Sequence, residues 1–221
     1  TLTISGTGAI PDFEFVMGET PNNIYGGANT PWRSYLIRKV VVNEGITSVG
    51  SMALAYLEKM ESISLPASLR ELGDYALANS FALKQIVLPE NLETLDEMAL
   101  FQCSGLSSVH IPAGVKNIGS EALDGCRLDS ITVDEANTAF CAEDGVLYTK
   151  DKKELLAITS NRTELTIPDS VTRVGSALFF DGQNIVSVTI GAQCDWGMNL
   201  SLCNSLEQIT VVDSNPYLCA K

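Results

Sequence analysis

Few residues of this 221-residue chain are suited to catalysis, and its one histidine, His110, is the first to consider. A hydrolase of the Ser-His-Asp or Cys-His type would have to use it as the general base. His110 lies between Val109 and Ile111, an alternation typical of a strand, so its side chain points away from the two apolar ones. We therefore interpret His110 as a solvated strand residue and predict that the chain is not an enzyme.

The six cysteines allow zinc binding, disulfide formation or packing as buried thiols. No Cys-x-x-Cys pair is present, and Cys103 and Cys126 are 23 residues apart (126 minus 103), which is not a spacing of metal ligands. We interpret these two as packed thiols. A disulfide framework stays open as an alternative, particularly for Cys141, Cys194 and Cys219. No calcium-binding loop accompanies the acidic pairs, so we expect no metal and no cofactor.

Charge and composition exclude further classes of function. The chain carries 14 basic and 27 acidic residues, a net charge of −13, which would repel a phosphate backbone. We therefore expect no nucleic-acid partner. Its apolar runs fall far short of the roughly 20 residues that a bilayer span requires, so we expect no membrane insertion. The chain begins at Thr1 with no signal segment before it, and we expect a trimmed or excised piece of an extracellular or cell-surface protein.

The strongest pattern in the sequence is an internal repeat. The segment Ile63-Ser64-Leu65-Pro66 recurs as Ile86-Val87-Leu88-Pro89 and as Val109-His110-Ile111-Pro112, at an offset of 23 both times (86 minus 63). A fixed period of this length predicts a solenoid in which each turn buries its apolar edge on the next. The approximate turns are 36–58, 59–81, 82–104, 105–127, an irregular 128–163, 164–184, 185–205, and an unfinished one from 206.

Each repeat has the same local pattern. An apolar-x-apolar strand is ended by a proline, which has no N–H to donate to a strand ladder. A second short extended piece ends near a glycine, and a small helical turn is expected around an Ala-Leu pair such as Ala76-Leu77. The predicted fold class is an α/β solenoid, with parallel strands stacked into an extended sheet and short helical turns on the other side.

The repeat from Met60 to Leu83 resembles the BspA-type leucine-rich repeat, and the resemblance covers about residues 36–221. The irregular segment 128–163 resembles the hairpin-bearing repeat variant of that family. The resemblance implies a right-handed solenoid. It also implies a place in surface or secreted proteins of host-associated bacteria, with adhesion or protein binding as the role.

The two ends of the chain do not follow the period. Residues 1–35 contain a strand-like alternation and a Gly/Pro/Asn-rich stretch with five aromatic residues, and we interpret them as an N-terminal cap. An aromatic ligand pocket is the alternative. The C-terminus stops inside a repeat, so we expect residues 36–221 to be a truncated part of a longer solenoid.

The predicted site is the outward face of the strands, which is nearly free of charge on an acidic protein. Its candidate binding residues are Val41, Ser64, Gln85, Val87, Ser108, His110, Thr132, Thr166, Thr189 and Thr210. Sheet propensity alone would also favour Val and Thr at such positions. The expected function is a non-catalytic extracellular protein-recognition or adhesion module, possible partners being host extracellular or cell-surface proteins. The alternative is a structural spacer that presents another domain.

Overall fold

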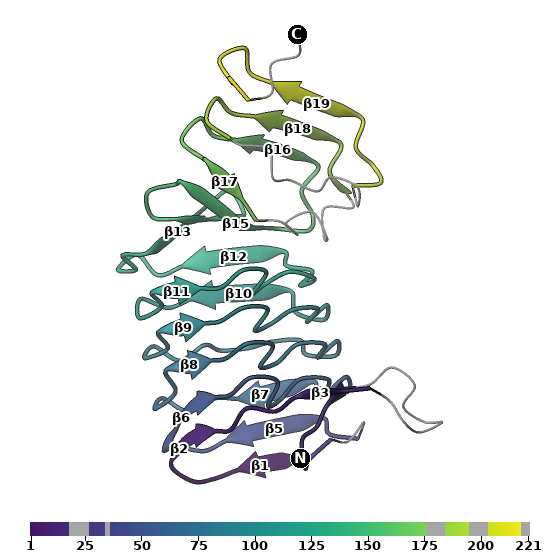
Figure 1. Cartoon of the computed structure of the whole chain (residues 1–221), viewed down its shortest axis with the longest axis vertical. Helices are drawn as coiled ribbons and strands as arrows, with labels where there is room; N and C mark the ends of the chain where they lie inside the picture. The colour runs from purple at the N-terminus through teal and green to yellow at the C-terminus, as the bar shows by residue number, and fades with distance from the viewer. Residues whose placement is uncertain (18–26, 34–35, 176–183, 195–202, 218–221) are drawn as a thin grey trace.

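The computed structural model describes residues 1–17, 27–33, 36–175, 184–194 and 203–217. The chain forms a solenoid whose strands stack along its long axis, from β1 at one end to β19 at the other (Figure 1). About seven turns repeat every 23 residues or so, and strands of successive turns are parallel. The predicted solenoid of stacked parallel strands is confirmed.

One side of the solenoid carries the strands that the apolar-x-apolar pattern predicts, here called the primary strands. They are β1 (Leu2–Ile4), β5 (Lys39–Val42), β7 (Ser62–Ser64), β10 (Ser108–Ile111), β12 (Ser130–Val133), β16 (Glu164–Ile167), β18 (Ser187–Ile190) and β19 (Gln208–Val211). These strands form three sheets, β1-β5-β7, β10-β12 and β16-β18-β19, and not one continuous sheet. Residues 86–88 form no regular strand, and a single bridge from Ser62 to Gln85 connects this turn to β7.

The second extended piece of each repeat builds a sheet of its own from what we call the secondary strands. These are β2 (Gly8–Ile10), β6 (Ile46–Val49), β8 (Glu71–Leu72), β9 (Thr94–Leu95) and β11 (Asn117–Ile118). They pair in the order β11-β9-β8-β6-β2, and every pair is parallel. The strands point their apolar residues into a core in which Leu72 and Leu95 are fully buried.

The turns on the remaining side are not helical, so the predicted helical turns are wrong; the described residues contain no α-helix. The amide N–H groups of Leu54, Leu77 and Leu100 each donate to a carbonyl of the next turn, at 2.9 Å. These bonds replace the i to i−4 bonds of a helix. A left-handed backbone residue recurs every 23 residues, as at Tyr75 (φ 54°) and Met98 (φ 53°), and interrupts any helical run.

The segment 1–35 contributes to both sheets as well as to the end of the solenoid. β1 pairs in parallel with β5, and β2 pairs with β6, so the first ten residues add one turn to the stack. A short antiparallel pair follows, formed by β3 (Phe15–Val16) and β4 (Gly27–Ala28). Of the five aromatic residues expected here, Tyr25 and Tyr35 lie outside the described residues. The division of the chain at residue 35 stays a prediction.

The irregular segment interrupts the stack with an antiparallel hairpin. β13 (Phe140–Glu143), β14 (Val146–Thr149) and β15 (Glu154–Ile158) follow one another, and β17 (Arg173–Val174) pairs in parallel with β15. The first hairpin turn is Asp144-Gly145, with φ of 49° and 73°, which is the backbone that a two-residue hairpin loop requires. Figure 1 shows this sheet between the lower and upper parts of the solenoid.

Candidate functional site

The outward side chains of the primary strands, with Gln85 and Val87 from the turn that has no regular strand, form the predicted site, which we call the strand face. The alternation of inward and outward residues is clearest at two neighbours: Val87 is 80% exposed, whereas Leu88 is 5% exposed. In the strand register Val41 lies beside Ser64, His110 beside Thr132, and Thr189 beside Thr166 and Thr210. Outward residues of successive turns therefore form columns along the solenoid.

The structure groups the ten predicted residues into two blocks. Seven lie on turns that precede the hairpin sheet, namely Val41, Ser64, Gln85, Val87, Ser108, His110 and Thr132. The other three, Thr166, Thr189 and Thr210, follow it on β16, β18 and β19. The sequence analysis missed one position, Thr3 of β1, which lies beside Val41 and extends the first block. The alternation of Leu2, Thr3 and Ile4 was the signal that could have included it.

Hydroxyl, imidazole and amide groups dominate the chemistry of the strand face. The Nδ1 atom of His110 lies 2.9 Å from the Oγ1 atom of Thr132, and the Nε2 atom of Gln208 donates to Thr210 Oγ1 at 3.2 Å. His110 is exposed, and its ring contacts the hydroxyl group of a threonine. Its surroundings are those of a surface residue on a strand.

Two predicted thiols lie in the core. Cys103 and Cys126 are 0% and 1% exposed, and their Sγ atoms donate to the carbonyls of Leu77 and Leu100, each at 3.3 Å. Neither is in a disulfide, so the prediction of packed thiols is confirmed for this pair. Cys219 lies outside the described residues. Within the described ranges, no three His, Cys, Asp or Glu side chains gather as a metal site would require.

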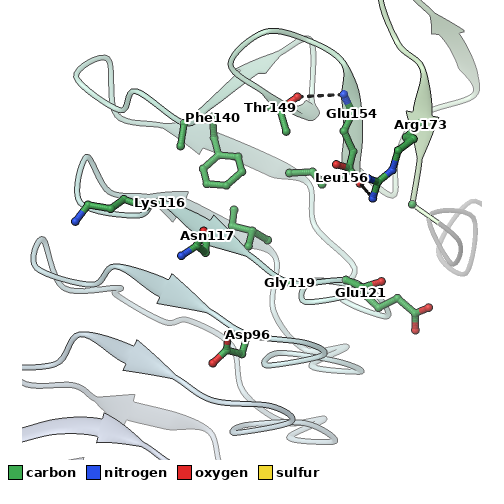
Figure 2. Close-up of a pocket in the computed structure, with 14 residues that line it drawn as sticks. Asp96, Lys116, Asn117, Gly119, Glu121, Phe140, Thr149, Glu154, Leu156 and Arg173 are labelled. Atoms are coloured by element: carbon green, nitrogen blue, oxygen red, sulfur yellow. Dashed lines mark hydrogen bonds and ion pairs between the residues drawn. The ribbon is translucent and has the colours of Figure 1, made fainter. Parts of the chain in front are cut away.

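A pocket of about 390 Å³ lies beside the secondary strands, where the hairpin sheet interrupts the stack. Figure 2 shows β11 and its flanking residues below the pocket, with Phe140 and Leu156 of the hairpin sheet above. Arg173 donates to Glu154 at 2.8 Å on one side of it. The sequence analysis did not predict this pocket. The feature of the sequence that could have indicated the pocket is the irregular repeat, because an inserted hairpin displaces the next secondary strand.

Carboxyl groups of adjacent turns face one another on the secondary strands. The pKa of Glu71 is raised by burial and by the nearby Asp96, which also makes a hydrogen bond with it. Burial and the charge of Asp74 raise the pKa of Asp96, while its bond to Glu71 lowers it. The hydrogen bond between the two carboxyl groups thus raises the pKa of Glu71 and lowers that of Asp96. This pair adds to the acidic character of the surface near the pocket.

Comparison with known families identifies the repeat. A model of the BspA type leucine rich repeat region matches six copies, over residues 32–143 and 153–218. The chain belongs to this family. The resemblance drawn from the repeat of residues 60–83 is thus confirmed, and BspA-type repeats account for most of the chain. No curated protein matches it.

Solved structures similar to this BspA-type chain are bacterial leucine-rich repeat proteins. A leucine-rich repeat protein from Eubacterium ventriosum is 22% identical, with a TM-score of 0.66 over 95% of this chain and 67% of that chain. The pneumococcal vaccine antigen PcpA is 21% identical, with a TM-score of 0.68 over 94% of this chain and 61% of that one. A leucine rich cell surface protein from Faecalibacterium prausnitzii is 18% identical, with a TM-score of 0.59 over 94% and 70%. These likenesses show the fold. The chain spans about two thirds of these proteins' length.

Proposed function

We propose that the strand face binds a protein, and that the chain serves as a non-catalytic recognition or adhesion module of a bacterial surface or secreted protein. The observation that carries this proposal is the strand face itself.

Short uncharged side chains suit the centre of a protein interface. Desolvating a hydroxyl or an apolar group costs less than desolvating a charge, and the cores of interfaces are depleted in charged residues. Solenoids of stacked repeats present extended surfaces of this kind to their partners. Val87, at 80% exposed, is a large apolar side chain in the first block of the face, and it offers the partner an apolar contact.

The extracellular part of the proposal rests on the neighbours' names. One is a cell surface protein and another a vaccine antigen. Among the described residues, no helix has the length and apolar character needed to span a bilayer. We infer the same setting for this chain, with host extracellular or cell-surface proteins as the class of partner.

The test introduces negative charge at uncharged positions of the strand face. The double variant Val87→Glu with Thr189→Glu places a carboxylate in each block of the strand face. Binding to immobilised extracellular matrix proteins and to intact host cells should fall at least about tenfold, because each charge must be desolvated at the interface.

The matched control, Thr138→Glu with Asn204→Glu, adds the same charge at exposed positions outside the primary strands. It should bind as the wild type does. Wild-type binding that is retained in the strand-face double variant would reject the strand face as the site. Absence of any wild-type binding to these partners would favour the spacer role.

A further inference from the structure

Among the described residues, no strand follows β11 in the column of secondary strands. In the regular turns a residue just past each secondary strand donates its N–H to the turn before: Asp96 to Leu72 O at 2.8 Å, and Gly119 to Leu95 O at 2.7 Å. The same pattern resumes beyond the hairpin, where Gly175 donates to Leu155 O at 3.0 Å. Ile118 O is the next acceptor in this series. No hydrogen bond from any residue that the structure describes reaches it.

The open edge of β11 lies along the pocket. Residues 116–121 form one wall, while Phe140 and Leu156 stand opposite with apolar side chains (Figure 2). A main-chain acceptor therefore faces the pocket beside an apolar surface. An exposed strand edge with a side-chain pocket is the combination by which proteins bind extended peptides through strand addition. The pocket volume of about 390 Å³ is in the range of small ligand sites.

We propose that an extended peptide segment of a partner protein adds in parallel to β11 and takes the position of the missing secondary strand. The filled positions show the chemistry that fits. They read Arg70-Glu71-Leu72-Gly73, Glu93-Thr94-Leu95-Asp96, Lys116-Asn117-Ile118-Gly119 and Thr172-Arg173-Val174-Gly175. The occupant is therefore polar, then aliphatic, then glycine as in three of these four turns. This site is separate from the strand face and goes beyond the function proposed above.

Two details define the occupant further. At Gly119 the turns lie so close that a Cβ atom would lie 2.5 Å from Glu97 N, and a glycine at the matching position of the peptide avoids such a contact. The cations at the rim are already paired, Lys116 with Glu93 at 2.7 Å and Arg173 with Glu154 at 2.8 Å. The carboxylate of Asp96 also lines the pocket. A basic polar residue is therefore favoured in the segment.

The test uses acetyl-Thr-Arg-Val-Gly-amide, which reproduces the sequence of residues 172–175, as the probe. Titrated at millimolar concentration into the ¹⁵N-labelled chain, it should cause saturable amide shifts that centre on residues 116–121. The control peptide has sarcosine in place of glycine, a single N-methyl group that removes the donor to Ile118 O. It should bind about fivefold more weakly, the effect of losing one hydrogen bond.

A protein variant gives an independent readout. Asn117→Trp, at an exposed position on the pocket wall, should fill the site and abolish the shifts. Val87→Glu on the strand face should leave them unchanged, which separates this site from the proposed function. The proposal is overturned if the glycine peptide causes no saturable shifts, if both peptides bind equally, or if Asn117→Trp binds like the wild type. Occupation of the edge by the chain's own residues would give the first of these results.

Discussion

The regular turns of residues 36–127 and the hairpin segment of residues 128–175 pair their strands in different ways. In the regular turns each secondary strand is parallel to the one before, and turn amides bond to the next turn. In the hairpin segment the pairs β13-β14 and β14-β15 are antiparallel, and the register shifts between Leu147 and Tyr148. The regular turns thereby build the strand face, whereas the interruption builds a pocket beside β11, whose edge pairs with no further strand of the described residues.

The difference shows how one repeat supplies two kinds of surface. A period of 23 residues repeats each outward position, so the strand face can only offer a column of similar side chains. The inserted hairpin brings Phe140, Glu154 and Arg173 to the neighbourhood of β11, and no regular turn makes that combination. Specific recognition of a short segment is more easily built at the interruption than on the repetitive face.

The largest effect is expected from a charge in the regular core. Leu88→Asp removes roughly 1.5–3 kcal/mol of burial and places an unpaired carboxylate in the column, for a total above about 4 kcal/mol. Val87→Asp, one residue away, should cost less than about 1 kcal/mol because Val87 is 80% exposed. Thermal melting of the two variants by circular dichroism checks the contrast. Equal melting temperatures would mean that the inward and outward faces are wrongly assigned.

A smaller loss is expected where the two regions join, at the buried Asn137. Its Nδ2 atom donates to the carbonyls of Pro112 and Val115, and its Oδ1 atom accepts from the amides of Ala139 and Phe140. Asn137→Ala leaves these buried groups unpaired and should cost about 3 kcal/mol, or about 6–12 °C in melting temperature.

The matched variant for this junction is Asn91→Ala. Asn91 is exposed, and its Nδ2 atom donates to the Ala67 carbonyl alone. Its loss should cost under about 0.5 kcal/mol. If the two asparagine variants melt together, Asn137 does not hold the hairpin sheet to the regular turns.

The smallest expected effect is a gain in stability from Glu71→Gln in the regular turns. The pKa of Glu71 is raised in the folded chain, first by burial and then by Asp96. The folded state therefore binds this proton more tightly than the unfolded state, and the stability it contributes at low pH is lost as pH rises through the raised pKa. At about pH 7 the glutamine variant should melt roughly 1–2 °C above the wild type. The difference should vanish near pH 3.5, where Glu71 is protonated in both states. A pH-independent difference would contradict this linkage.

The sequence predicted the parts of the fold that recur. Columns such as Leu72 and Leu95 repeat an apolar residue at a fixed offset, and burial of the stacked turns requires that pattern. The turns around Ala76-Leu77 were mistaken for helices because Ala and Leu favour helix locally, whereas hydrogen bonds to the next turn decide the backbone there.

The site was predictable in part for the same reason. Alternation placed His110 and Thr132 on one face, but no period indicates what an insertion brings together. The pocket depends on contacts between β11 and residues more than 20 positions away in an irregular segment. One set of contacts of the irregular segment does recur later in the chain. Asn215 repeats the contacts of Asn137: it donates to the carbonyls of Gly191 and Cys194 and accepts from the amide of Tyr217.

Amide hydrogen exchange of the unmodified chain tests the stack most directly. The amides of Leu54, Leu77 and Leu100 bond to the following turn, so they can exchange only when neighbouring turns separate. We expect them to be protected as strongly as the amides of Asp96 and Gly119, which lie just past β9 and β11 and bond to the turn before. Fast exchange at the three leucines, beside protected strands, would contradict a solenoid whose turns are bonded to one another on every side.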